Sequence, residues 1–323
     1  MERLDFIASK IIDAVEGYEF ESFLIGASLP TGIYEREDSL RARLKIRGKE
    51  SVKNQLTREL GIRLARMAKK KVEYMKPDVT INLTIDRKNN VDVMIKSRTL
   101  ALYGRYIKKS RGIPQRQDRC KNCEGVGCNY CRNTGLSGYE SVEGIIAKGL
   151  VEITGGQSPK FTWIGSEDQN SLVLGTGRPF YARILNPRIR SLGGNKIRAK
   201  GLMATLSVID DEKPELQPRF KVKTRIQARS EGELSRENLR KLKSLAGLEV
   251  RFENRARMTT KRIYSAKARR LEGNEFILTI IADGGLMIKQ FVGGEEYMSP
   301  NISDCLQTKC ECIAFDILDV SLQ

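Results

Sequence analysis

The sequence contains no histidine. This absence excludes histidine acid–base catalysis, Ser-His-Asp and Cys-His nucleophile systems, and every zinc site that uses imidazole. A catalytic or metal site in this chain must therefore use carboxylates, tyrosine, lysine or cysteine. The sequence also lacks any apolar run close to the roughly 18 to 20 residues that cross a bilayer, and its N-terminus lacks a signal-peptide cleavage pattern. We expect a cytoplasmic protein with no membrane partner.

Acidic residues are too few to balance the basic ones. The chain has 57 Lys and Arg against 40 Asp and Glu, a formal net charge of +17. A surplus of this size favours a polyanionic partner, most commonly nucleic acid, although a solvated basic surface is the alternative. With 323 residues, 40% of them hydrophobic, the chain is long enough for two domains with real cores.

Hydrophobic periodicity predicts an α+β protein. Residues 1–40 look mostly helical, 51–67 form a helix, and 79–85 and 91–95 alternate as a strand pair. A linker at 132–140 precedes a helix at 141–150. The second half carries a helix at 235–246 and strands at 180–185, 202–209, 220–228, 248–254, 276–281 and 313–320. Many strands with few helices indicate a largely antiparallel mixed sheet.

Two C-x-x-C pairs predict a structural zinc knuckle, with Cys120, Cys123, Cys128 and Cys131 as its ligands. Four thiolates satisfy tetrahedral Zn²⁺ and leave no open position for a substrate. A redox dithiol and unpaired buried thiols are the alternatives. We interpret Cys305, Cys310 and Cys312 as buried or incidental thiols.

Two basic stretches are candidates for RNA contact. Arg105 and Arg111 lie among aromatic residues between 102 and 115, a mixture that suits base stacking and phosphate binding. Segment 186–200 has a Gly-Gly hinge and the cations Arg188, Arg190, Lys196, Arg198 and Lys200, which predict a mobile basic loop. A further cluster consists of Arg255, Arg257, Lys261 and Arg262. A solvated basic face is the alternative for each.

An acidic pair, Glu167-Asp168, precedes the glycine-rich turn at 175–180. Such a pair is more often a turn or helix-cap feature than a catalyst. The Gly-x-Gly at Gly175 and Gly177 lacks a third glycine and is followed by Arg178-Pro179, so a nucleotide-binding loop is not indicated.

Motifs spread over nearly the whole chain resemble those of archaeal tRNA pseudouridine synthases with a THUMP-containing N-terminal domain. They lie at 17–20, 23–26, 103–106, 111–115, 120–135, 140–143, 167–168, 174–180 and 284–291. The resemblance implies a THUMP-containing, zinc-binding and tRNA-binding α/β domain over residues 1–138. A pseudouridine synthase catalytic domain over 139–323 would follow.

The same resemblance implies an isomerase that converts uridine to pseudouridine in the tRNA T-loop, at tRNA positions 54 and/or 55. Asp168 is implied as the essential aspartate, either as a nucleophile or as a stabiliser of charge on the ribose. Tyr264 is implied to stack on the flipped base and Lys289 to keep the aspartate ionised. The family uses no organic cofactor, and no obligatory protein partner is evident.

Three departures from the family pattern are visible. Ser166 stands where an arginine is usual, so a base-displacing role passes to Arg178. Met287 replaces a common tyrosine in the substrate site, and an earlier C-x-x-C pair is absent. A non-catalytic tRNA-binding or folding protein with the same architecture is the alternative function. A zinc-containing chaperone module is weaker, because the cysteine pairs do not repeat.

Overall fold

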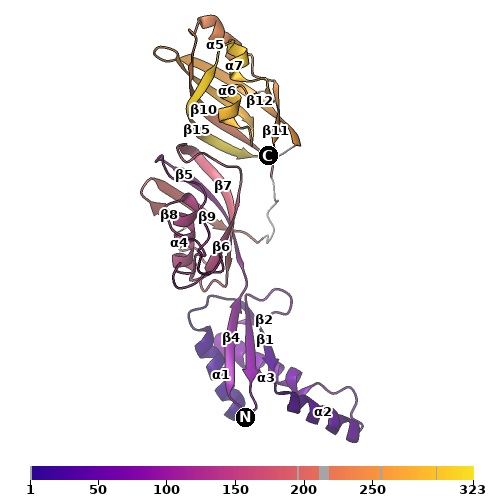
Figure 1. The fold of residues 1–323 in the computed structure, drawn as a ribbon. Helices are drawn as coiled ribbons and strands as arrows, with labels where there is room; N and C mark the ends of the chain where they lie inside the picture. The colour runs from indigo at the N-terminus through magenta and orange to yellow at the C-terminus, as the bar shows by residue number, and fades with distance from the viewer. Residues whose placement is uncertain (1, 195, 211–217, 255–256, 296) are drawn as a thin grey trace. The chain divides into compact units, whose positions relative to one another are not determined.

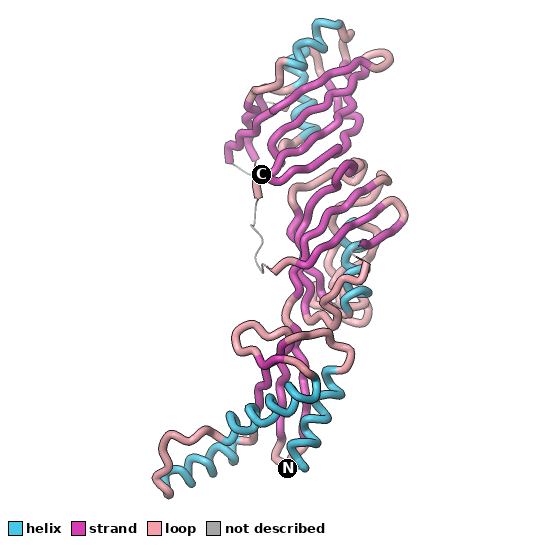
Figure 2. The backbone as a smooth tube through the Cα atoms, turned by 180° about the vertical axis from the view of Figure 1, so that it is seen from behind, coloured by secondary structure: helices cyan, strands magenta, loops and turns pink. Residues whose placement is uncertain are grey.

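A computed structural model describes residues 2–194, 196–210, 218–254, 257–295 and 297–323. The chain forms two compact units. The N-terminal unit comprises 1–100, 150–158 and 184–193, and the C-terminal unit comprises 101–149, 159–183 and 194–323. Figures 1 and 2 show the elements of both units. No helix among the described residues is long and apolar enough to cross a membrane.

The N-terminal unit packs helices against one four-stranded sheet. Its helices are α1 (Glu2–Val15), α2 (Thr31–Arg43) and α3 (Val52–Ala68), and its strands are β2 (Lys71–Val72), β1 (Ser22–Ser28), β3 (Val79–Ile85) and β4 (Val91–Ser97), in spatial order. Strand β1 is parallel to β2 and β3, whereas β4 is antiparallel to β3. The core combines one face of α1 and α3 with the inward residues of β1 and β3.

The expectation that residues 1–40 are mostly helical is wrong for β1. Phe23, Ile25 and Ala27 are buried and alternate with less buried neighbours, as a strand with one core-facing side requires. Leu24 and Gly26 interrupt this period in the sequence and hide it. Strand β1 is central in its sheet, so the missed strand organises the whole unit.

The C-terminal unit is built on one large mixed sheet, in the order β14-β11-β12-β13-β10-β15-β7-β5-β9-β8, with β6 paired to β7. The strands are β5 (Leu100–Lys108), β6 (Gln157–Trp163), β7 (Val173–Leu185), β8 (Lys196–Ala199), β9 (Leu202–Val208), β10 (Phe220–Ser230), β11 (Glu249–Asn254), β12 (Arg257–Arg270), β13 (Glu275–Asp283), β14 (Met298–Ser299) and β15 (Cys310–Leu322). The helices are α4 (Val142–Thr154), α5 (Arg236–Lys243), α6 (Ile288–Gly293) and α7 (Ile302–Leu306). The predicted α+β class and largely antiparallel sheet are confirmed.

The domain boundary lies earlier than the expected residue 138. The basic, aromatic stretch after residue 100 is strand β5, which pairs antiparallel with β9 and belongs to the large sheet. Its buried residues alternate because one face is covered: Leu102, Gly104 and Tyr106 point inward. Residues 101–138, including the cysteine knuckle, therefore belong to the C-terminal unit.

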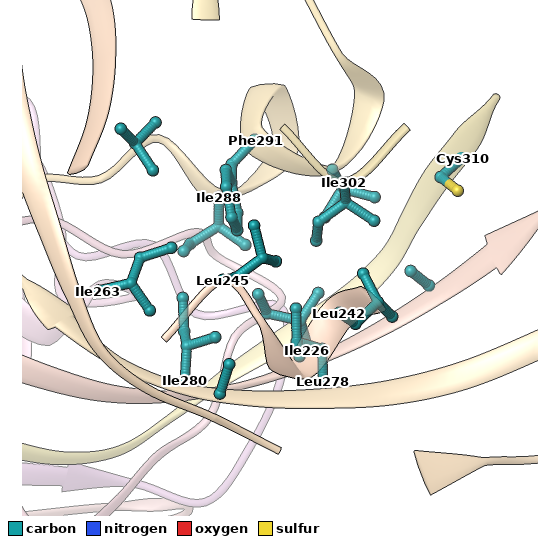
Figure 3. Close-up of a cluster of buried hydrophobic side chains, with 14 of the residues drawn as sticks. Ile226, Leu242, Leu245, Ile263, Leu278, Ile280, Ile288, Phe291, Ile302 and Cys310 are labelled. Atoms are coloured by element: carbon teal, nitrogen blue, oxygen red, sulfur yellow. The ribbon is translucent and has the colours of Figure 1, made fainter. Parts of the chain in front are cut away.

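One hydrophobic core joins helices α5, α6 and α7 to one face of β10, β12 and β13. Figure 3 shows its side chains converging, with Leu242, Ile288, Phe291 and Ile302 from the helices and Ile226, Ile263, Leu278 and Ile280 from the strands. Each is 8% exposed or less, and burying an aliphatic or aromatic side chain stabilises by about 1.5 to 3 kcal/mol. This core fixes α6, which carries Lys289.

Candidate functional site

Asp168 lies in the loop 164–172 between β6 and β7. Its Oδ2 accepts a hydrogen bond from Lys289 Nζ at 2.7 Å, and its Oδ1 accepts one from Asn170 N at 2.9 Å. These donors, Lys289 above all, hold the pKa of Asp168 below its usual value of 3.8 although partial burial opposes them. The carboxylate raises the pKa of Lys289 in turn. Since Lys289 is 63% exposed, the pair matters for the ionisation of Asp168 more than for stability.

Glu167, next to Asp168, is a fully buried carboxylate held by two cations. Lys108 Nζ lies 2.9 Å from Oε1, and Arg178 Nε lies 3.3 Å from Oε2. The Tyr106 hydroxyl donates to Oε2 at 2.8 Å and accepts from Gln115 Nε2. Removing one member of such a buried pair costs about 3 to 5 kcal/mol, because it leaves an uncompensated charge. The backbone at 167 is therefore firmly anchored.

The far end of the same loop is fixed by Asp316 of β15. Its Oδ1 accepts from Leu172 N at 3.0 Å, and its carboxylate forms ion pairs with Arg111 and Arg225, each at 2.8 Å. Lys108 Nζ also donates to the carbonyls of Asp168 and Gln169 at 3.3 Å. The loop thus presents Asp168 from a backbone held at both ends.

A cavity of about 400 Å³ opens beside Asp168. Its polar lining includes Glu167, Asp168, Asp283 and Lys289, and its apolar lining includes Val222, Ile280, Leu286, Met287, Ile288, Phe315 and Ile317. Cavities that bind small ligands measure about 300 to 1,000 Å³ and combine apolar walls with a few polar groups. The cavity is therefore suited to one ring system placed against a carboxylate.

Phe220 forms a wall that this cavity shares with a second one of about 650 Å³. The ring is packed against two glycines: a Cβ at Gly284 would lie 2.1 Å from it and a Cβ at Gly165 would lie 2.9 Å from it. Gly165 also has a φ of +77°, which a side chain would disfavour. These two glycines allow the ring to stand between the cavities.

The structure brings Met287 and Lys289 to Asp168 but places Tyr264 elsewhere. Met287 precedes helix α6 and lines the first cavity, whereas Tyr264 lines the second. The Tyr264 hydroxyl donates to Asp283 Oδ1 at 3.0 Å. This carboxylate raises the pKa of Tyr264, so the neutral phenol is favoured over the phenolate that a proton acceptor needs.

Three other predicted contact residues are engaged within the protein. Arg178 is only 2% exposed and donates to the Ile164 carbonyl as well as pairing with Glu167. Arg105 donates to the Thr176 carbonyl and hydroxyl at 2.8 Å. Arg111 pairs with Asp316. Their guanidinium groups hold the backbone around the site in this structure.

The basic segment 186–200 is not one mobile loop. Arg188 lies over the Tyr18 ring, and Arg190 donates to the Arg98 carbonyl at 2.7 Å within the N-terminal unit. Glu19 Oε2 accepts from the backbone N–H groups of Arg190 and Ser191. Lys196 and Arg198 are exposed on strand β8, followed by exposed Lys200. Asn195 and Arg255 lie outside the described residues.

The four predicted cysteine ligands lie together, with every pair of sulfurs within 4.8 Å. Cys131 Sγ is 3.8 Å from that of Cys123 and 3.7 Å from that of Cys128. A tetrahedron with Zn–S bonds of about 2.3 Å has sulfurs about 3.8 Å apart. Burial opposes ionisation of Cys131, yet N–H donors from Cys128 and Gly135 lower its pKa to about 7. The residues fit a tetrathiolate metal site.

Sequence reasoning missed Lys108, Phe220 and Asp316. Lys108 and Asp316 are buried charged residues. Their ion-pair partners are remote in the chain, so the residues next to them in the sequence do not indicate those partners. Phe220 begins a strand and resembles any strand aromatic. The one available signal was glycine: Gly165 and Gly284 flank the motifs and both approach this ring.

Comparison with known proteins gives two family matches. Residues 7–84 match the family model described as Pus10 THUMP domain, archaeal, so the N-terminal unit contains a THUMP domain. Residues 101–321 match Pus10, C-terminal. The chain belongs to the Pus10 family.

Curated relatives cover the whole chain. It is 34% identical over 323 residues to the tRNA pseudouridine synthase Pus10 of Nitrosopumilus maritimus, covering 100% of this chain and 84% of the relative. It is 33% identical to the protein of the same name from Cenarchaeum symbiosum, covering 95% and 75%. A solved Cbf5-Nop10-Gar1 complex aligns over 67% of this chain and 57% of the other with a TM-score of 0.33 and 9% identity.

Gly284→Ala is expected to displace the Phe220 ring, because the new Cβ would lie 2.1 Å from it. Overpacking of this kind costs about 1 to 3 kcal/mol, measurable by urea unfolding. Gly293→Ala in α6 is the control, since a Cβ there meets nothing within 4 Å. Equal stability of the two variants would contradict the wedged position of Phe220.

Proposed function

We propose that the protein is a tRNA pseudouridine synthase with Asp168 as its catalytic residue. The observation that carries this is the ionised Asp168 carboxylate, paired with Lys289 at the wall of a cavity with apolar sides. The family relatives named tRNA pseudouridine synthase supply the reaction and the substrate. The formal net charge of +17 supports a polyanionic substrate. We assign the T-loop uridines, at tRNA positions 54 and/or 55, as targets in the cytoplasm.

The reaction needs a carboxylate that is charged, aimed and close to a flipped nucleoside. Lys289 keeps Asp168 charged and the Asn170 N–H orients it. The carboxylate then acts as nucleophile or stabilises positive charge on the ribose while the base detaches and turns. The apolar walls limit water at the reacting centre, and no organic cofactor is required.

A non-catalytic tRNA-binding protein remains the second candidate. It would need the same basic surface and the same fold. The buried carboxylates of Glu167 and Asp316, each paired with two cations, fix the backbone on both sides of Asp168, and this favours catalysis instead. A binding protein has no need of a carboxylate held facing the RNA, since it would repel phosphate.

We further propose that Cys120, Cys123, Cys128 and Cys131 hold a structural Zn²⁺. Four sulfur ligands leave no position for substrate, so the metal would stabilise the loop between β5 and α4. Lys160 of β6 donates to the Gly125 carbonyl of this loop at 2.9 Å. Strand β6 leads directly into the Asp168 loop, so the knuckle helps to position this loop through its contact with β6.

Asp168→Asn should abolish pseudouridine formation in an unmodified tRNA transcript and change tRNA affinity only a few fold, because the amide keeps the shape but loses the charge. Carbodiimide mapping by primer extension measures the product. Asp118→Asn, an exposed acid of the same unit, should retain wild-type turnover. Turnover by Asp168→Asn would refute the assignment.

Lys289→Met should move the acid limb of the kcat/KM profile to higher pH. Lys289 lowers the pKa of Asp168, so the active carboxylate now persists to lower pH than an ordinary aspartate. Without the ammonium, that pKa rises and activity is lost earlier as the pH falls. Lys309→Met, which removes an exposed lysine of the same unit, should leave the limb unchanged. If the acid limb of Lys289→Met were not shifted, Lys289 would not control the ionisation of Asp168.

Cys123→Ser should abolish zinc binding and destabilise the C-terminal unit, since a structural zinc can couple about 10 kcal/mol to folding. The stability loss falls there because the knuckle belongs to that unit, and not to an N-terminal domain. Metal analysis and thermal unfolding measure both effects. Cys305→Ser, outside the knuckle, is the matched control. Wild-type protein that contains no zinc would end the zinc assignment, and so would a Cys123→Ser variant that unfolds like Cys305→Ser.

A further inference from the structure

The proposed chemistry at Asp168 does not use the second cavity, which lies beside the first. Its volume of about 650 Å³ exceeds that of the cavity beside Asp168. The two share Gly165, Phe220, Asp283 and Gly285 in their linings, so they are neighbours, and Phe220 is the aromatic residue common to both.

Three aromatic side chains line the second cavity, Trp163, Phe220 and Tyr264, and each is held in place by its neighbours. Trp163 stacks on Phe161 with ring centroids 5.1 Å apart, and it also packs against Tyr106 and Phe180. Tyr106 is in turn bonded to the buried Glu167. Phe220 stands between two glycines, and Tyr264 is oriented by its hydrogen bond to Asp283. Fixed aromatic rings are the surfaces on which bases stack.

Cations accompany these rings. Arg219 and Lys261 line the cavity, and Lys221 Nζ lies 3.9 Å from the centroid of the Tyr264 ring. The Asp283 carboxylate also lines the cavity, where it accepts hydrogen bonds from the Tyr264 hydroxyl and from Arg262 N. Rings beside lysine and arginine match the base and phosphate of a nucleotide.

We propose that the second cavity binds the nucleotide directly adjacent in the RNA chain to the uridine at Asp168. Two consecutive nucleotides then leave the RNA stack together, one on each side of Phe220. Tyr264 stacks on the neighbouring base, and Arg219 and Lys261 contact phosphate. The inference rests on the proposed function for the identity of the first nucleotide and extends recognition to the second.

A double-mutant cycle between protein and RNA tests this. Binding is measured by fluorescence anisotropy in the Asp168→Asn background, with T-stem–loop RNA hairpins that lack one base each: at the target, at its 5′ neighbour, at its 3′ neighbour, or at a remote loop position. Each RNA is bound to protein with Tyr264 and to Tyr264→Ala. Tyr264 is partly exposed, and urea unfolding checks that the variant folds. Met258→Ala, an exposed position on the same strand, is the control.

Loss of one neighbouring base should weaken binding about 5- to 150-fold when Tyr264 is present, the usual effect of losing one base–aromatic stack. The same loss should cost less than about twofold in Tyr264→Ala. Equal penalties in both proteins at both neighbours would overturn the proposal, and so would coupling of Tyr264 to the target base instead. Because these affinities need no turnover, they are independent of whether wild-type protein makes pseudouridine in the intact hairpin, which separately tests the proposed function.

Discussion

The burial of Glu167 between Lys108 and Arg178 is the constraint on which the candidate site depends. A buried carboxylate is tolerated only when its charge and lone pairs are satisfied, and here strands β5 and β7 supply the cations while Tyr106 supplies a further donor. Because the adjacent residue is Asp168, this requirement fixes the position of the more exposed carboxylate. The carboxylate that could react, Asp168, remains accessible, whereas the carboxylate that anchors its backbone, Glu167, is buried.

The same buried cluster extends to the second cavity. Tyr106 joins Glu167 to the aromatic group of Phe161, Trp163 and Phe180, and Trp163 reaches the cavity wall. The two cavities therefore have Phe220 in common, and the same buried cluster around Tyr106 and Glu167 supports both. Substitutions in this cluster are expected to affect both cavities, whereas substitutions at Lys289 or Tyr264 are expected to affect one cavity each.

Features that depend on local spacing were predictable from the sequence. The four cysteines, the alternation of β3 and the helix of α3 capped by Ser51 are of this kind. Strand β12 was not, because its side chains are mostly polar and only Ile263 and Ala266 among them are buried. The boundary near residue 100 also escaped, since the partner of β5 is the distant β9. Asp168 was identified by resemblance, as an acidic pair alone does not distinguish a catalyst from a turn. Long-range partners such as Asp316 have no sequence signature.

The two units are interleaved along the chain. The N-terminal unit also draws in segments 150–158 and 184–193, which follow the first stretch of the C-terminal unit in the sequence. Glu19 accepts hydrogen bonds from the backbone of residues 190 and 191 in the second of these segments. A single cut therefore cannot yield either unit intact, and a fragment ending at residue 100 would leave Glu19 without these donors. For this protein, domain dissection requires grafted or circularly permuted chains. Recombination between relatives would similarly have to exchange several segments at once to carry over the whole N-terminal unit.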